Sequence, residues 1–455
     1  MKIVTVNPAT GKKIATYTEH SDAEIDDILR KNQSAFLKWR ETGYEQRSRL
    51  FRIMAAILRE RKEDFARTVT AEMGKLISES RAEVEKCAWV CEYYADNTAL
   101  FLKPEFISTV ATRSYITFNP LGSILAIMPW NFPFWQVFRF CAPALMAGNA
   151  CLLKHASNVP GCALSIETLF RQAGFPDDLF RVILRDGKDL SKVISSPIIK
   201  AISVTGSSAA GRAIASEAGR HLKKTVLELG GNDPYLILAD ADLDKAVEIC
   251  FLSRMINGGQ SCIAAKRFIP VREIASEFTE KLILKMKKVK MGDPLDTTTE
   301  LGPLARMDLR NELHKQVTGS IAMGAKCLLG GIIPPIKGSY YPPTVLTAVS
   351  SDMPAYREEL FGPVAVIIPA QDETAAWRIA NDSTFGLGAA VFTRDVQRAE
   401  KIAADKLETG SCFINTYVRS DPRLPFGGIK DSGYGRELSH YGIKEFVNIK
   451  TIYIE

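Results

Sequence analysis

One cysteine, Cys262, stands in a sequence context that suits nucleophilic chemistry. It ends the stretch 257–262 (NGGQSC), and two basic residues, Lys266 and Arg267, follow it closely. Glycine permits tight or left-handed backbone, so this stretch can bring a thiol close to another molecule. A thiol reacts as the thiolate, which nearby cations or backbone N–H groups favour. A buried, inert cysteine is the ordinary alternative, so Cys262 needs chemical partners elsewhere in the chain.

Two polar residues, Glu228 and Asn131, are candidate partners of the cysteine. Glu228 opens the stretch 228–231 (ELGG) after an apolar run. Burial there raises a carboxyl pKa and suits a general base, and capping of the next segment is the alternative. Asn131 lies in 129–133 (PWNFP), a rigid loop that can hold its amide N–H as one donor of an oxyanion hole. The second donor would be a backbone N–H beside the thiol.

Two short stretches have the composition of a nucleotide-binding edge. In 204–211 (VTGSSAAG) a Gly-Ser turn precedes a predicted helix, whose free N–H groups suit a pyrophosphate. Lys154, after an earlier apolar run, adds a cation for a ribose or phosphate, and a carboxylate in 358–363 (EELFGP) can accept ribose hydroxyls. An ordinary helix start and a solvated lysine are the alternatives, because the chain has neither GxGxxG nor GxxxxGK[ST] at this place.

The elements that position these residues alternate between strand and helix from residue 121 onward. Short apolar runs separated by helix-length segments predict βαβ units and a parallel sheet. Ligands bind at the carboxyl ends of such strands, where Asn131, Lys154 and Glu228 all lie. The predicted strands are 123–128, 150–154, 181–184, 200–204 and 225–229, and the predicted helices are 134–147, 160–174, 187–195 and 208–219.

Helical patterns precede this section, and a second α/β section follows it. Apolar residues at three- and four-residue spacing predict helices over 22–39, 44–61 and 63–99. Residues 103–120 alternate apolar and polar side chains, as do 447–454, so we expect these two stretches to pair as an intersubunit arm. In the second section the predicted strands are 266–271, 344–348, 363–369, 388–393 and 410–415, and the predicted helices are 273–290, 373–381 and 395–406.

The composition predicts a soluble cytoplasmic protein. A chain of 455 residues is long for one core, and its net charge of +6 is small and is weak evidence for a nucleic-acid partner or a membrane surface. The nine cysteines include no CxxC pair, and the five histidines have no metal-ligand spacing, so we expect reduced thiols and no metal. The start is not a signal peptide, and the longest apolar region, 134–153, is interrupted by polar residues.

The motifs are more informative about function together than separately. Seven occur in order: PWNFP (129–133), Lys154, TGS (205–207), ELGG (228–231), GGQSC (258–262), EELFGP (358–363) and PFGGIKDSGYGRE (425–437). This pattern resembles the NAD(P)-dependent aldehyde dehydrogenase superfamily, from about residue 5 to 455. Within that superfamily the chain is most similar to the bacterial succinate-semialdehyde dehydrogenase subgroup, and the stretch 436–448 (RELSHYGIKEFVN) adds to the likeness.

The resemblance implies a role for each motif. Cys262 matches the thiol that attacks the aldehyde carbon, Asn131 the oxyanion donor, and Glu228 the base that activates water to release the acid. A hydride passes to the nicotinamide before that release, so the implied cofactor is NAD(P)+. The residues matching adenosine and pyrophosphate contacts are Trp130, Lys154, Gly206 and Ser207, and those matching contacts around the nicotinamide half are Leu229, Glu359 and Phe361.

Departures from the family pattern bear on cofactor and substrate. Many members have Lys-Pro-x-Glu at the ribose, whereas 154–157 reads KHAS, so Ser157 removes the repulsion of a 2′-phosphate and NADP+ is admitted beside NAD+. Arg139 matches an arginine that holds the substrate carboxylate, a task that suits a guanidinium. An internal ion pair of Arg139 is the alternative. A second arginine of some members is replaced by Ile256, and Ser420 is a weaker candidate for the carboxylate.

We therefore expect an enzyme with a small, carboxylate-bearing aldehyde substrate, succinate semialdehyde first. Glutarate semialdehyde or lactaldehyde, with Arg139 structural, is an alternative, and a non-catalytic binding or structural member of the family is a third reading. The implied fold is α/β, with two interleaved open domains and a small β oligomerisation arm in a homodimer or homotetramer. The expected cofactor-binding domain is 1–102 with 121–230, the catalytic domain is 231–436, and the arm is 103–120 with 437–455.

Overall fold

A first sheet of six strands lies in the half of the chain that carries the predicted nucleotide-binding edge. The computed structural model describes residues 2–187 and 190–455. In this sheet the order is β19-β9-β8-β5-β6-β7, parallel except for β19, which is antiparallel to β9. Its strands are β5 (Ser123–Met128), β6 (Ala150–His155), β7 (Phe180–Val182), β8 (Ile199–Thr205), β9 (Lys224–Glu228) and β19 (Gly433–Tyr434).

The helices between these strands confirm the predicted βαβ rhythm. They are α5 (Trp135–Met146), α6 (Pro160–Gln172), α7 (Ser191–Ser195) and α8 (Ser208–Arg220). Helix α7 is shorter than the predicted 187–195, and residues 188–189 of that prediction lie outside the described residues. The parallel sheet and its carboxyl-end residues were therefore predictable from the alternation of apolar runs and helices.

A second sheet of seven strands follows, with the order β12-β13-β14-β11-β10-β16-β17. Only β12 runs antiparallel to its neighbour. Its strands are β10 (Pro234–Ile237), β11 (Arg267–Pro270), β12 (Lys326–Leu329), β13 (Thr344–Thr347), β14 (Val364–Ile367), β16 (Gly388–Phe392) and β17 (Ser411–Ile414). Its helices are α9 (Leu243–Met255), α10 (Arg272–Met286), α11 (Met307–Ala322), α12 (Pro354–Arg357), α13 (Glu373–Asn381) and α14 (Val396–Asp405).

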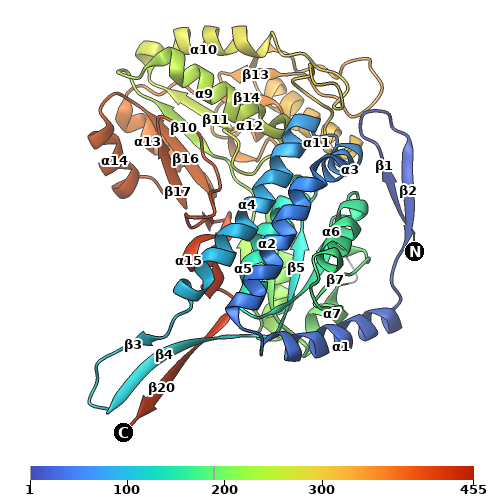
Figure 1. Cartoon of the computed structure of the whole chain (residues 1–455). Coiled ribbons are helices and arrows are strands. Elements are labelled where there is room, and N and C mark those ends of the chain that lie inside the picture. The colour runs from blue at the N-terminus through green and yellow to red at the C-terminus, as the bar shows by residue number, and fades with distance from the viewer. Residues whose placement is uncertain (1, 188–189) are drawn as a thin grey trace.

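The N-terminal part forms a hairpin and a helical layer. The hairpin is β1 (Lys2–Val6) with β2 (Lys13–Thr18), and the helices are α1 (Asp22–Trp39), α2 (Tyr44–Glu60), α3 (Lys62–Met73) and α4 (Ile77–Phe101). The single helix predicted over 63–99 was wrong, because Gly74 ends α3 in a left-handed conformation (φ 77°) and α4 starts anew. In Figure 1, α2 and α4 lie side by side across the body, and both pack on α5.

The arm is a three-stranded sheet that projects from the body (Figure 1). It consists of β3 (Glu105–Phe106), β4 (Arg113–Pro120) and β20 (Val447–Ile454). Strand β20 runs antiparallel to β4, with Val447 opposite Pro120 and Ile454 opposite Arg113. The predicted pairing of the two alternating stretches is thus confirmed. The short helix α15 (Ser439–Lys444) precedes β20.

Helix α5 is the most deeply buried element near the site. All of its residues are buried, and it packs on α4, β5 and β6. Its first turn is held by Glu83 of α4, whose Oε1 accepts the N–H groups of Phe134 (2.8 Å) and Trp135 (2.9 Å). A carboxylate there satisfies otherwise unpaired donors and favours the positive end of the helix dipole. The loop that carries Asn131 is therefore anchored to α4.

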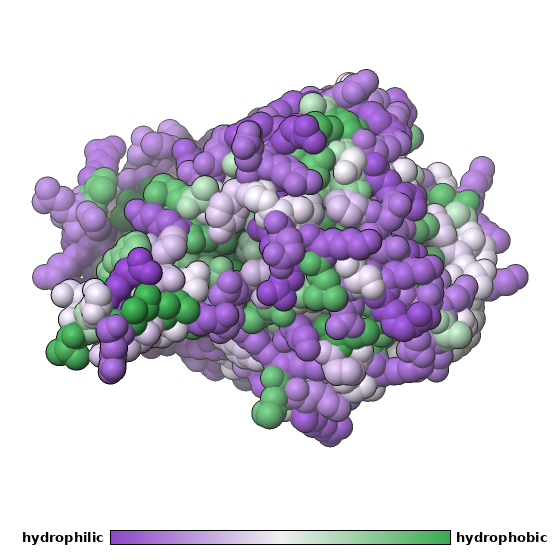
Figure 2. Space-filling view, turned by 60° about the horizontal axis from the view of Figure 1, so that its bottom comes forward, coloured by the Kyte–Doolittle hydropathy of each residue, from purple (hydrophilic) through white to green (hydrophobic). Residues whose placement is uncertain are grey.

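The surface is mostly polar on the face drawn in Figure 2. Figure 2 shows a face that is largely hydrophilic, with hydrophobic residues in separate groups, as is ordinary for a folded domain. Among the described residues, no helix is both long and apolar enough to span a membrane.

Candidate active site

The loop before Cys262 depends on left-handed backbone. The short helix η2 (Ile256–Gly259) leads into it, and φ is 53° at Asn257, 60° at Gly258 and 78° at Gly259. A Cβ at Gly259 would lie 2.2 Å from the carbonyl oxygen of Gly362, which no real contact allows. Glycine is thus required both by the dihedral angle and by the close approach of the EELFGP motif itself, through Gly362.

Asn131 lies against the segment that leads to the cysteine. Its Nδ2 donates to the carbonyl of Gln260 at 3.1 Å. Asn257 Nδ2 donates to the carbonyls of Asn131 (2.8 Å) and Gln260 (3.1 Å), which ties the two loops together. An amide nitrogen carries two hydrogens, and among the described residues only one of those of Asn131 has a partner. The role of Asn131 as an oxyanion donor, which needs the other hydrogen, stays a prediction.

Three motifs meet through Lys266. Its Nζ donates to the carbonyls of Ser261 (3.0 Å) and Cys262 (2.7 Å) and lies 3.3 Å from Oε1 of Glu359. The same Glu359 oxygen accepts the N–H of Gly231 at 3.0 Å. A Cβ at Gly231 would lie 2.6 Å from the carbonyl oxygen of Cys262. GGQSC, EELFGP and ELGG, far apart in sequence, are therefore one packed unit.

The Cys262 thiol lies among charged groups. Burial raises its pKa to about 12, while the charges of Arg139 and Lys266 lower it. The two cations favour the thiolate, so the loss of the thiol proton is assisted by charges already built into the site. Sequence reasoning placed Lys266 near the thiol but gave it no contacts.

Glu228 ends β9 as a buried carboxyl group. Burial raises its pKa well above the ordinary value; Glu437 raises it further, and Arg139 and Arg436 oppose the shift. Neither carboxyl oxygen has a hydrogen-bond partner among the described residues, and a Cβ at Gly427 would lie 2.7 Å from Oε1. A carboxyl of raised pKa, free to bind a water molecule, has the properties of a general base.

Arg139 has an internal partner. Its side chain is 2% exposed, and it forms an ion pair with Glu437. Its Nη2 donates to Thr205 Oγ1 at 3.3 Å, and the guanidinium lies 4.6 Å from the centre of the Phe426 ring. The role of Arg139 in holding a substrate carboxylate stays a prediction, because its charge is already compensated in this structure. Glu437 was missed as a site residue, although it ends the glycine-rich motif 425–437.

Ser420 brings another missed residue into the site. Its Oγ accepts a hydrogen bond from Lys86 Nζ of α4 at 2.7 Å. Lys86 also lies 4.2 Å from the centre of the Trp135 ring. No local motif marks Lys86, since it is one polar residue in a long amphipathic helix.

The nucleotide-side residues lie along the carboxyl edge of the first sheet. Lys154 is in β6, and burial lowers its pKa, with Asp186 opposing. Gly206 and Ser207 join β8 to α8, where Ser207 Oγ caps the helix by accepting the Ala210 N–H at 3.3 Å. Lys154 and the N-terminus of α8 both lie at the carboxyl edge of this sheet, with β5 between their strands, and a cation and a helix N-terminus are the donors that suit a pyrophosphate.

Four further residues are predicted to contact the cofactor: Leu229, Trp130, Phe361 and Ser157. Leu229 fills the space above Gly211, where a Cβ would lie 2.4 Å from Leu229 Cδ2. Trp130 and Phe361 meet edge to face, with ring centres 5.7 Å apart. Ser157 is exposed on the loop between β6 and α6 and lines a small cavity with Arg185.

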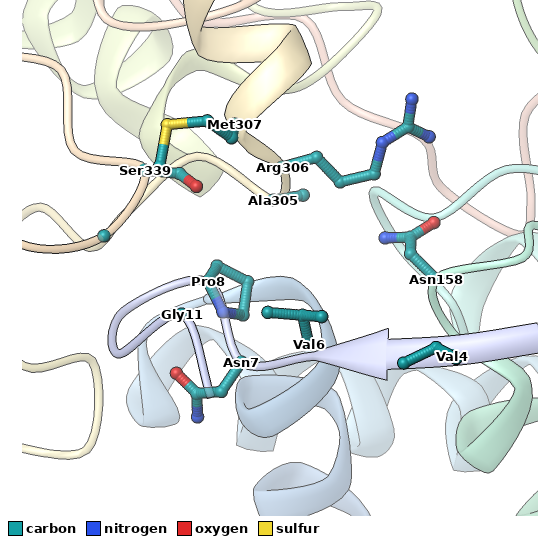
Figure 3. Close-up of a pocket in the computed structure, with 11 residues that line it drawn as sticks. Val4, Val6, Asn7, Pro8, Gly11, Asn158, Ala305, Arg306, Met307 and Ser339 are labelled. Atoms are coloured by element: carbon teal, nitrogen blue, oxygen red, sulfur yellow. The ribbon is translucent and has the colours of Figure 1, made fainter. Parts of the chain in front are cut away.

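A separate cavity of about 280 Å³ lies beside β1 and contains none of the predicted catalytic residues. Figure 3 shows Asn158 and Arg306 at one end of it and the β1 residues below. No group of three or more potential metal ligands is found among the described residues.

The sequence was also compared with known protein families and proteins, which identifies the class of protein. The model of the aldehyde dehydrogenase family matches residues 1–452, and the chain belongs to that family. It is 49% identical over 454 residues to the probable succinate-semialdehyde dehydrogenase [NADP(+)] of Synechocystis, covering 100% of both chains. It is 48% identical over 450 residues to the succinate semialdehyde dehydrogenase [NAD(P)+] Sad of Escherichia coli, covering 99% of this chain and 97% of that one.

Solved structures agree with this assignment. The structure of Gox0499 superposes with a TM-score of 0.98 at 39% identity, covering 100% of both chains. The succinic semialdehyde dehydrogenase of Streptococcus pyogenes, in complex with NADP+, superposes with a TM-score of 0.97 at 38% identity, covering 99% of both chains. The predicted aldehyde dehydrogenase fold and family are confirmed.

Proposed function

We propose that this protein oxidises succinate semialdehyde to succinate with NADP+, and with NAD+ as a second acceptor. The observation that carries the proposal is the packing of three segments: Asn131 donates to the carbonyl of Gln260, and Gly231, which follows Glu228 in the ELGG motif, lies against the carbonyl of Cys262. Full-length relatives named for this reaction, at 45–49% identity, support it. A non-catalytic role does not need Cys262, Asn131 and Glu228 on these segments.

Cys262 attacks the aldehyde carbon as the thiolate. The second Nδ2 hydrogen of Asn131 and the N–H of Cys262 donate to the oxygen that becomes negative in this step. Because Asn131 is itself fixed by Gln260 and Asn257, the donor is positioned before the substrate arrives. A single donor of this kind is worth a factor of about 10²–10³ in kcat.

Glu228 acts in the release of the acid. Its carboxylate takes a proton from a water molecule, which then attacks the acyl group on Cys262. Burial without hydrogen-bond partners makes this carboxylate a stronger base than one in water. Hydrolysis by Glu228 also disfavours transfer of the acyl group to a thiol cofactor.

NADP+, when bound, supplies the hydride acceptor. Lys154, Gly206 and Ser207 would hold its phosphates. Trp130, Leu229, Glu359 and Phe361 would line the rest of its path. Ser157 replaces a carboxylate that would repel a 2′-phosphate, which supports the use of NADP+. In this structure Glu359 pairs with Lys266 and Gly231, so it must share its oxygens to accept ribose hydroxyls.

We also propose the domain division given above, a homo-oligomer built through the arm, and a cytoplasmic location. The two sheets and the projecting strands support the division and the arm, except that β19, within 231–436, belongs to the first sheet. Exposed apolar residues on the arm, among them Phe106, Ile449 and Tyr453, support burial against another subunit. Nine free cysteines support a reducing compartment.

The test of function is a set of initial rates of NADPH and NADH formation with four aldehydes. Succinate semialdehyde is compared with glutarate semialdehyde, propanal and lactaldehyde. A strong preference in kcat/KM for succinate semialdehyde is expected. Equal rates on propanal would leave the thiol chemistry and remove the substrate, and no turnover with any aldehyde would favour a binding or structural role.

A further inference from the structure

Helix α4 carries two carboxylates one turn apart, Glu79 and Glu83, and each accepts backbone N–H groups from a different loop of the site. Glu83 holds the first turn of α5, which follows the PWNFP loop. Glu79 Oε1 accepts the N–H of Asn257 at 2.7 Å. Side chains four residues apart on a helix lie on the same face. One face of α4 therefore holds both the PWNFP loop and the loop that leads to the cysteine.

The two loops are joined at Asn257. Its φ of 53° is left-handed, a conformation that a residue other than glycine keeps where its surroundings fix it. Its Nδ2 donates to the carbonyls of Asn131 (2.8 Å) and Gln260 (3.1 Å), and Asn131 Nδ2 donates to the same Gln260 carbonyl at 3.1 Å. The side chain that orients Asn131 is thus attached to backbone that Glu79 holds.

The start of α4 also fixes the other side of Asn131. Lys75 forms a buried ion pair with Glu83, and its Nζ lies 3.7 Å from the centre of the ring of Phe132, the residue after Asn131. Lys75 and Glu83 therefore hold the PWNFP loop, and Glu79 holds the opposite loop against it.

The hydrogen bond from Asn257 needs an oxygen at position 79 rather than a negative charge. Burial raises the pKa of the Glu79 carboxyl; the hydrogen bond from Asn257 and the charge of Lys75 lower it, and Glu83 raises it. A carboxyl group has an oxygen that can accept an N–H in either protonation state, and so does an amide. A glutamine therefore keeps this contact, whereas an aspartate, one methylene shorter, carries its oxygens to a different place.

We propose that Glu79 is a positioning residue of the oxyanion hole. By holding the Asn257 N–H it fixes the left-handed turn before Cys262, and through Asn257 it orients the amide of Asn131 toward the oxygen that becomes negative. In this role Glu79 acts through Asn257, without contact to the reacting atoms. This inference rests on the proposed function, in which Asn131 is an oxyanion donor.

The test compares Glu79→Met, Glu79→Asp and Glu79→Gln with a control, Glu92→Gln, which removes a carboxylate of α4 that pairs with Arg59 at the surface. Each variant is assayed with succinate semialdehyde and with butanal, an uncharged aldehyde of the same length. Glu79→Met and Glu79→Asp should lower kcat and kcat/KM about 10- to 100-fold with both aldehydes, because a displaced donor stabilises the transition state less. Glu79→Gln should recover most of that loss, and the control should behave as wild type, since exposed ion pairs contribute little.

A double-mutant cycle separates positioning from general support of the fold. Asn131→Ala alone should lower kcat about 10²–10³-fold. With Asn131 already changed, adding Glu79→Met should lower kcat by less than about twofold, because the two residues act through the same donor. A further loss of about 10- to 100-fold in the double variant, as large as in Glu79→Met alone, would overturn the inference.

Alkylation of Cys262 provides a second readout. In the reaction with iodoacetamide the thiolate displaces iodide from a saturated carbon, so no oxyanion forms and the Asn131 donor is not used. The rate, followed by mass spectrometry of the Cys262 peptide, should change by less than about threefold in Glu79→Met. A fall in alkylation as large as the fall in kcat would make Glu79 a general support of the thiol and would overturn the inference.

The outcomes distinguish this inference from the proposed function. Full activity in Asn131→Ala would overturn the oxyanion role on which the inference rests. A loss in Asn131→Ala with wild-type kcat in Glu79→Met and Glu79→Asp would overturn only the role of Glu79. An active Glu79→Asp beside an impaired Glu79→Gln would show that charge rather than reach matters, and a loss confined to succinate semialdehyde would indicate substrate recognition; both would also overturn the inference.

Discussion

The ion pair between Arg139 and Glu437 offers the sharpest test of how the site is built. In Arg139→Met the carboxylate of Glu437 loses its cationic partner and keeps the hydrogen bond from Ser203 Oγ at 3.3 Å, while it stays buried next to Glu228. Removing one member of a buried pair costs about 3–5 kcal/mol, because it leaves an uncompensated charge. The variant should therefore unfold in urea at a much lower midpoint, and Arg139→Lys, which keeps the charge, should lose less.

The same ion pair determines how the stability of Arg139→Met changes with pH. Burial already raises the pKa of Glu437, and Arg139 opposes that shift, so the variant raises the folded-state pKa further. Unfolding then releases a proton, and stability falls as pH rises from the unfolded-state pKa through the folded-state pKa. Arg139→Met should thus lose more stability relative to wild type at pH 8 than at pH 5, as measured by urea denaturation at both values.

Activity measurements complete the test. Loss of the Arg139 charge raises the pKa values of Cys262 and Glu228, since it lowers both in the wild type. The pH profile of kcat/KM should therefore move to higher pH with succinate semialdehyde and with butanal alike. A variant that is stable, keeps its butanal activity and loses only succinate semialdehyde would refute this reasoning and establish Arg139 as the carboxylate clamp.

Three other substitutions test separate parts of the site. Glu228→Gln should give a burst of NADPH followed by steady turnover about 10²–10⁴-fold slower, seen in stopped flow, and a missing burst would count against a role in release. Gly259→Ala should cost about 2–4 kcal/mol in urea unfolding, from left-handed strain and contact with Gly362. Ser157→Glu should lose NADP+ turnover selectively, and unchanged cofactor selectivity in initial rates would contradict the role of Ser157.

Much of the architecture could be predicted because it is encoded locally. The apolar runs predicted β5, β6, β8 and β9, and the glycines before Cys262 predicted a tight loop, as the positive φ at Gly259 confirms. The break between α3 and α4 was missed, since one glycine in a periodic stretch is often tolerated inside a helix.

The partners of the site residues were harder to predict. Lys86 and Ser420 are separated by 334 positions, and no periodicity reports a contact over that distance. The ion pair of Arg139 with Glu437 was open as an alternative, but the identity of the carboxylate depends on how the last loop folds back. Shifts in pKa depend on burial and on neighbouring charges, which only the packed structure supplies.

The glycine-rich loop 425–437 is synthesised after most of the chain. Strand β19 adds to the edge of β9, and Ser432 Oγ donates to the carbonyl of Gly230 at 2.7 Å. Gly427 lies against Glu228, and Glu437 neutralises Arg139. Gly427, Ser432, β19 and Glu437 are all synthesised after Asn131, Glu228 and Cys262. A nascent chain therefore carries Cys262 and Glu228 without the loop that completes their surroundings until Glu437 has been added.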